Sequence, residues 1–136
     1  MTRPLRTILL VEDDPDIQLI TRLSLEIGGG YSVGVCASGA EALQAAAASP
    51  PDLILLDVMM PGMDGPTTME ALRRLPGLDA VPVVFFTANT QAQMREELLR
   101  AGALGLIIKP VEPNTLVEQI RALWARNTDA PDTQAL

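Results

Sequence analysis

The chain has 136 residues, of which 48% are apolar, and this length and composition predict one domain with a sizeable core. A net charge of −7, from 10 basic and 17 acidic residues, argues against nucleic-acid binding through a basic face. The sequence has no apolar stretch of the roughly 20 residues needed for a membrane span. It has no histidine for nucleophilic triads or zinc sites, and its single cysteine, which excludes an internal disulfide, fits the reducing cytoplasm.

Apolar runs alternate with amphipathic segments along the chain, which predicts strands that are each followed by a helix. The predicted strands cover residues 7–11, 31–36, 53–57, 81–86 and 104–108. The second run contains Gly34 and is expected nearer an edge of the sheet. Such an alternation predicts an α/β fold with a parallel sheet, helices on both faces and right-handed crossovers.

The first helix is predicted to begin at Pro15, with Asp14 as its N-cap. Its apolar residues recur at spacings of three and four and form one face: Ile17, Ile20, Leu23 and Ile27. The other helices are predicted over residues 39–48, 66–75, 90–101 and 113–126. Residues 1–6 and 127–136 are expected to be a short N-terminal tail and a flexible C-terminal tail around one domain over 7–126.

Polar residues stand at the ends of four of the predicted strands. They are Glu12 and Asp13 after the first strand, Asp57 at the end of the third, Thr87 after the fourth and Lys109 after the fifth. Because the carboxyl ends of parallel strands share one edge, these side chains are expected to meet there. Carboxylates about 5 Å apart repel by roughly 3 kcal/mol per pair at an effective dielectric near 20, and a divalent cation with oxygen ligands relieves that repulsion.

These residue types suit phosphoryl transfer, which needs mostly positioning and charge neutralisation. Asp57 is a candidate nucleophile, because aspartyl phosphates are known covalent intermediates. The Thr87 hydroxyl is a donor for one phosphoryl oxygen, and Lys109, the only lysine, is a positive charge for another.

Four segments together resemble the receiver domain of bacterial two-component response regulators, of the stand-alone single-domain type. They are Glu12-Asp13, the stretch LILLDVMMPGMDG around Asp57, Thr87-Ala88, and AGALGLIIKP around Lys109. The resemblance covers about residues 7–126. It implies a flavodoxin-like (βα)5 three-layer sandwich with the strand order 2-1-3-4-5.

The resemblance also implies roles for these residues. Asp57 would accept a phosphoryl group from a histidine kinase or a histidine phosphotransfer protein in a Mg²⁺-dependent reaction. Asp13 and Asp57 would bind Mg²⁺ through their side chains, Met59 through its backbone carbonyl, and Glu12 through water. Thr87 would bind a phosphoryl oxygen.

Three further features follow from the resemblance. Lys109 would bind another phosphoryl oxygen, and its bond to Pro110 is expected to be cis. The switch residues would be Thr87 and Leu106, the second at a position where the family usually has Phe or Tyr. A leucine there cannot present a ring or hydroxyl to a partner, so any output change is expected to spread through the loop after Thr87 and the helix over 90–101.

The predicted function is a phosphoacceptor signalling module that catalyses only its own phosphorylation and dephosphorylation. A downstream protein would bind the face formed by the fourth helix, the fifth strand and the last helix. No nucleic acid or membrane is expected as a partner, and the chain would be a monomer or weak dimer. Two alternatives stay open. One is a metal-dependent phosphatase with an aspartyl-phosphate intermediate, although Met59 stands where such enzymes favour a second Asp. The other is a receiver-like binding module that is never phosphorylated.

Overall fold

The computed structural model describes the backbone of residues 3–135 and the side chains up to residue 127. A five-stranded parallel sheet has the order β2-β1-β3-β4-β5, which confirms the predicted topology. Its strands are β1 (Thr7–Val11), β2 (Ser32–Cys36), β3 (Leu53–Asp57), β4 (Val83–Thr87) and β5 (Gly105–Ile108). Each lies within two residues of its predicted bounds.

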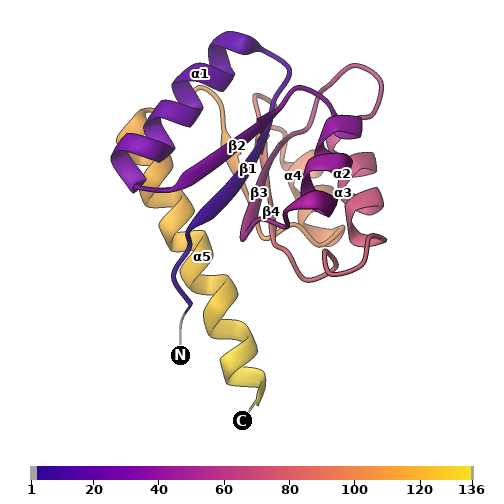
Figure 1. Ribbon diagram of the computed structural model, residues 1–136, viewed down its shortest axis with the longest axis vertical. Helices are drawn as coiled ribbons and strands as arrows, with labels where there is room; N and C mark the ends of the chain where they lie inside the picture. The colour runs from indigo at the N-terminus through magenta and orange to yellow at the C-terminus, as the bar shows by residue number, and fades with distance from the viewer. Residues whose placement is uncertain (1–2, 136) are drawn as a thin grey trace.

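The helices form two layers on the sheet (Figure 1). They are α1 (Pro15–Leu23), a π-helical segment η1 (Ser24–Gly28), α2 (Gly39–Ala48), α3 (Gly65–Arg73), α4 (Ala92–Arg100) and α5 (Pro113–Ala135). Figure 1 shows α1 and α5 on one face of the sheet and α2, α3 and α4 on the other. Over residues 3–135, none of these helices has the length and hydropathy that a bilayer crossing requires.

The central strands are continuous apolar runs because helices cover both of their faces. Every residue of β3 and of β4 is buried, whereas the edge strand β2 is largely accessible. Successive side chains point to opposite faces, so the core divides in two. One half, with Leu56 and Phe85, lies toward α2, α3 and α4, and the other, with Leu55 and Phe86, lies toward α1 and α5.

Short polar side chains cap three of the helices. Asp14 accepts hydrogen bonds from the N–H groups of the first turn of α1, as predicted, and Ser38 and Asp64 do the same for α2 and α3. Gly65 follows directly, and a Cβ there would lie 2.5 Å from the backbone oxygen of Asp57. This close approach lets α3 start against the end of β3.

The first helix differs from its prediction in the direction of its apolar face. Ile20 is 60% exposed and Ile27 is 80% exposed, while Thr21, Ser24 and Leu25 face the core. The π-helical segment begins at Ser24, so its i→i+5 turns shift Ile27 out of the 3.6-residue register but do not account for the exposure of Ile20. Of the four residues of the predicted face, Ile17 packs against the core whereas Ile20, Leu23 and Ile27 are exposed, so the spacing alone did not identify the buried side of this helix.

The last helix is longer than predicted. α5 continues to Ala135, through residues 127–135 that were expected to form a flexible tail. The polar composition of this segment does not prevent helix formation, because helix propensity depends on backbone and rotamer costs as well as on apolar content. Residue 136 lies outside the described residues, and the division into a domain over 7–126 with two tails stays a prediction.

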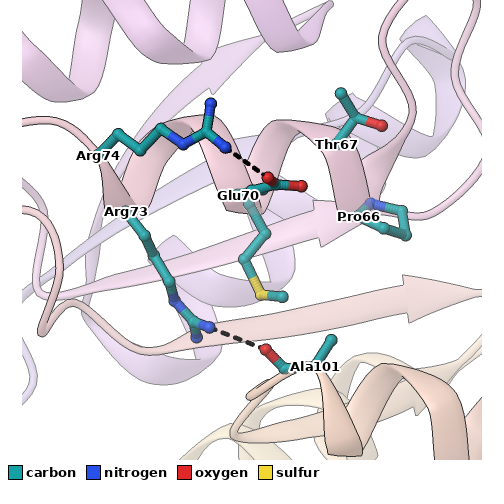
Figure 2. A pocket seen from close by; sticks show the side chains of 7 residues that line it. Pro66, Thr67, Glu70, Arg73, Arg74 and Ala101 are labelled. Atoms are coloured by element: carbon teal, nitrogen blue, oxygen red, sulfur yellow. Dashed lines mark hydrogen bonds and ion pairs between the residues drawn. The ribbon is translucent and has the colours of Figure 1, made fainter.

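Helices α3 and α4 are linked by an arginine at the rim of a surface pocket (Figure 2). Arg73 points from α3 toward the end of α4, where its guanidinium donates to the backbone oxygens of Ala101 at 3.0 Å and Gly102 at 2.7 Å. The neighbouring Arg74 instead pairs with Glu70 within α3 at 2.6 Å. Arg73 thus supplies donors to carbonyls that a helix end leaves without partners.

Candidate functional site

Three carboxylates meet at the carboxyl edge of the sheet, as the sequence predicted. Glu12 and Asp57 are buried, with exposed fractions of 1% and 5%, and Asp13 is exposed. One carboxylate oxygen from each lies within 4.8 Å of the others, so the group could hold a metal ion. The strand order explains the meeting, because β1 and β3 are hydrogen-bonded neighbours that end together.

Lys109 reaches this group from the end of β5. Its Nζ lies 2.6 Å from Oε1 of Glu12 and 3.3 Å from Oδ1 of Asp57. The backbone N–H of Lys109 donates to the carbonyl oxygen of Thr87 at 2.8 Å, which fixes the residue beside the end of β4. The peptide bond between Lys109 and Pro110 is cis, as expected. One ammonium therefore serves two buried carboxylates.

Thr87 is buried at the last position of β4, next to the strand that carries Asp57. Its Oγ1 accepts a hydrogen bond from the N–H of Asn89 at 3.0 Å, which leaves the hydroxyl hydrogen available for donation. On the other side, the N–H of Met59 donates to Oδ1 of Asp57 at 3.2 Å. The Met59 side chain is 72% exposed, so the loop after Asp57 is open to solvent.

The electrostatics at Asp57 reflect burial among charges. Burial raises the pKa of its carboxyl to about 6, the ammonium of Lys109 opposes this rise, and the charge of Glu12 adds to it. At neutral pH the carboxyl is therefore mostly ionised, but keeping this charge buried costs folding free energy. A cation bound between these oxygens would lower that cost.

Sequence reasoning missed two contacts of the lysine. In the structure Glu12 pairs directly with Lys109, and its other carboxylate oxygen accepts from the N–H of Asp14 at 3.1 Å. The role of Glu12 toward a metal through water stays a prediction. The ring of Phe86 also lies under the ammonium, with its centroid 4.9 Å from Nζ. The two adjacent phenylalanines of β4 are the sequence feature that could have predicted the contact between Phe86 and Lys109.

The structure does not bring Leu106 to the carboxylates. Leu106 is partly buried against the core on the side of α2, α3 and α4, whereas Ile107 faces the opposite core. Leu106 is paired in register with Phe85 of β4, and β4 separates it from Asp57 on β3. Its assignment as a switch residue stays a prediction.

An apolar groove of about 470 Å³ lies beside the lysine, between α1 and the start of α5. Its lining includes Ile17, Ile20, Phe86, Lys109, Val111 and Leu116. On α1 the groove is lined by Ile17 and by Ile20, which is 60% exposed. The rim of the site is therefore apolar on the side of α1.

The sequence is similar to those of known proteins. Residues 8–121 match the family described as "Response regulator receiver domain". The DNA-binding response regulator MtrA of Mycolicibacterium smegmatis is 39% identical over 124 residues, which are 91% of this chain and 53% of that protein. The transcriptional regulatory protein KdpE of Mycobacterium tuberculosis is 34% identical over 127 residues. The chain spans about half the length of these curated relatives.

Solved structures give the same answer. The chemotaxis protein CheY4 of Vibrio cholerae superposes with a TM-score of 0.82 at 30% identity, over 88% of this chain and 99% of that one. A putative response regulator from Chloroflexus aurantiacus superposes with a TM-score of 0.81 at 34% identity, over 90% and 99% of the two chains. With a family match over most of its length and the expected strand order and carboxylate cluster, this chain belongs to the receiver domain family of two-component response regulators.

Proposed function

We propose that Asp57 is the phosphoacceptor of this receiver domain and takes its phosphoryl group from a phosphohistidine of a histidine kinase or a histidine phosphotransfer protein. The observation that carries the proposal is the position of the Lys109 ammonium, 3.3 Å from Oδ1 of Asp57 at the rim of a three-carboxylate cluster. A carboxylate beside a single fixed ammonium and a buried hydroxyl is placed to receive a phosphoryl group and to neutralise its oxygens.

The transfer exchanges one bond to phosphorus for another. A carboxylate oxygen of Asp57 attacks phosphorus, a P–O bond forms, and the P–N bond to the donor imidazole breaks. The electron pair of that bond returns to the imidazole, which leaves neutral when its other ring nitrogen carries a proton. The ammonium of Lys109 and the hydroxyl of Thr87 would each hold one phosphoryl oxygen of the resulting acyl phosphate.

The donor set fits Mg²⁺. Asp13 and Asp57 offer carboxylate oxygens, Met59 offers a backbone carbonyl, and Glu12 would act through water. When bound, the ion supplies positive charge to the carboxylates and to the phosphoryl oxygens. The contacts of Lys109 support this arrangement. Its one ammonium is shared between Glu12 and Asp57, so the cluster of three carboxylates keeps negative charge that a cation would neutralise.

The phosphodonor is proposed to approach over α1. Ile17 and the exposed Ile20 of α1 line the groove beside Lys109, and Leu19 and Leu23 are further exposed apolar side chains on the same helix. A helix of a donor protein that buried these side chains would bring a phosphohistidine to the same rim. The apolar surface otherwise has a cost in water that a soluble partner would remove.

For the output, we propose a protein partner on α4, β5 and α5, with Thr87 as the residue that responds to the phosphoryl group and Leu106 in place of the usual aromatic residue. The chain itself would be a monomer or weak dimer whose only activities are its own phosphorylation and dephosphorylation. The relative MtrA is named as DNA-binding. The expectation that this chain has no nucleic-acid partner therefore stays open. The family match does not favour the phosphatase alternative.

Incubation with acetyl phosphate and Mg²⁺, followed by intact-mass measurement, tests the proposal. We expect one phosphoryl adduct per chain, which hydroxylamine removes because it is an acyl phosphate. Asp57→Asn should abolish the adduct, and Asp79→Asn, at an exposed turn residue, should leave it. An adduct that persists in Asp57→Asn, or no adduct in the unaltered protein with any donor tried, would refute the proposal. Repeated turnover of phosphate esters would favour the phosphatase.

A further inference from the structure

Lys109 must keep its ammonium at the phosphoacceptor although two different anions compete for it. Its Nζ lies 2.6 Å from Glu12 and 3.3 Å from Asp57, so in this structure the shorter contact is to the residue that does not accept the phosphoryl group. A lysine stem has four rotatable carbons and no intrinsic direction. Something besides the two carboxylates is needed to set where the charge stands.

The ring of Phe86 is the third group at the ammonium, with its centroid 4.9 Å from Nζ. That distance lies inside the range of about 6 Å over which a ring face attracts a cation. Phe86 is 2% exposed, so the contact is shielded from water, where cation–π attraction is stronger than at an exposed site.

The sheet explains why the ring is there. Phe86 is the register partner of Asp57 across β3 and β4, and side chains that are partners in a parallel pair point to the same face. The core alternation confirms the face, because Leu55 and Phe86 both lie in the cluster toward α1 and α5. Phe86 is therefore the lateral neighbour of the phosphoacceptor, on the side from which Lys109 arrives.

From these contacts we infer that Phe86 is a positioning residue, whose ring holds the Lys109 ammonium over Asp57. This inference rests on the proposed function for its catalytic consequence. An aliphatic side chain would fill the same core position, as Val84 does two residues earlier, but it has no negative face to offer a cation. Attraction to a ring is also less directional than a hydrogen bond. The contact therefore persists when the ammonium turns from Glu12 to a phosphoryl oxygen.

The chain offers a matched control, because its two phenylalanines are adjacent. Phe85 is fully buried like Phe86 but belongs to the opposite core, toward α2, α3 and α4. Phe85→Leu and Phe86→Leu remove the same atoms from equally buried sites, and only the second removes a ring from the lysine. Phe86→Tyr keeps the ring and is the conservative variant that should restore the behaviour.

A single lysine makes the position of the ammonium directly observable. Protein labelled with ¹³C at the lysine Cε gives one methylene signal, from Lys109. In the unaltered protein the attached protons should resonate upfield of their position in the denatured chain, because they lie over a ring face. Phe86→Leu should remove this ring-current shift, whereas Phe85→Leu and Phe86→Tyr should keep it.

The functional readout is the initial rate of Asp57 phosphorylation by acetyl phosphate at saturating Mg²⁺. Phe86→Leu should slow it about 2- to 30-fold, the range that corresponds to losing one cation–π contact, while Phe85→Leu and Phe86→Tyr stay near the unaltered rate. Equal slowing in both leucine variants, or no upfield shift in the unaltered protein, would overturn the inference.

The Lys109 resonance and the phosphorylation rate together distinguish a failure of this inference from a failure of the proposed function. If the unaltered protein forms no adduct, the proposed function fails, and the resonance still decides whether the ring holds the ammonium. If Phe86→Leu does not fold, the unaltered protein and Phe86→Tyr decide, since both must show the shift.

Discussion

Replacing Asp57 should stabilise the metal-free fold at neutral pH. Burial raises the pKa of the Asp57 carboxyl from its ordinary 3.8 to about 6, despite the opposing charge of Lys109. The folded chain therefore binds a proton more tightly than the unfolded chain does. Stability from this group is complete below pH 3.8 and is lost as the pH rises through about 6. Asn carries no charge at any pH, so Asp57→Asn escapes that loss.

The size of the effect follows from the pKa. A rise from 3.8 to about 6 corresponds to at most about 3 kcal/mol at 1.36 kcal/mol for each pKa unit, and less to the extent that water enters beside the exposed Met59. Asn retains an oxygen to accept from the Met59 N–H, so the hydrogen bond at 3.2 Å need not be lost. We therefore expect Asp57→Asn to be more stable than the unaltered protein at pH 7.5 and nearly equal to it at pH 4.

Urea denaturation followed by circular dichroism, in EDTA at pH 4 and 7.5, measures this difference. The quantity of interest is the change between the two pH values in the free energy of unfolding, compared between the two proteins. Asp79→Asn controls for the loss of one negative charge from a chain whose net charge is −7. If Asp57→Asn gives the same advantage at both pH values, or none at pH 7.5, the burial argument is wrong.

Three further changes test the packing and the site. Gly65→Ala should destabilise the fold by about 1–3 kcal/mol, because the new Cβ would lie 2.5 Å from the Asp57 carbonyl oxygen. Gly34→Ala should cost less, because its Cβ would make an ordinary contact at 3.5 Å. Equal losses of unfolding free energy in urea titrations would contradict this. Arg73→Ala should lower the stability by about 1 kcal/mol, because two hydrogen bonds to the end of α4 are lost. Arg74→Ala, which removes only an exposed ion pair with Glu70, should lower it by at most about 0.5 kcal/mol. Thermal unfolding of the two variants measures the difference, and the reverse order would contradict the prediction. Removal of Mg²⁺ should abolish adduct formation at Asp57 and, by calorimetry, Asp13→Asn should weaken Mg²⁺ binding; unaltered affinity would remove Asp13 from the ligand set.

Much of the fold could be predicted from the sequence because the strands are short and the central ones are buried. Runs such as Leu53-Ile54-Leu55-Leu56 end in polar residues, so both the strand and its terminus are marked. A parallel sheet then places all such termini on one edge, and the cluster of Glu12, Asp13 and Asp57 follows from topology alone.

What the sequence did not predict depends on directions within the fold. A helical repeat at Ile20, Leu23 and Ile27 defines a face but not whether the sheet or solvent receives it, and here solvent does. The pairing of Lys109 with Glu12 depends on where a flexible side chain ends, 97 positions away along the chain. The end of α5 was missed because a polar segment is compatible with both a helix and a coil.

The sole tryptophan is tied to the other end of the molecule. Trp124 is 6% exposed, its Nε1 donates to the backbone oxygen of Arg3 at 2.7 Å, and the Arg3 guanidinium lies 5.5 Å from its ring centroid. Arg3 precedes β1, a strand whose five residues span roughly 16 Å before the carboxylates begin. Intrinsic fluorescence will therefore report unfolding and the anchoring of the N-terminal segment, and it will be insensitive to ion binding at Asp57. An optical probe for that event has to be introduced, and Met59→Trp would place one at the rim, where the native side chain is 72% exposed.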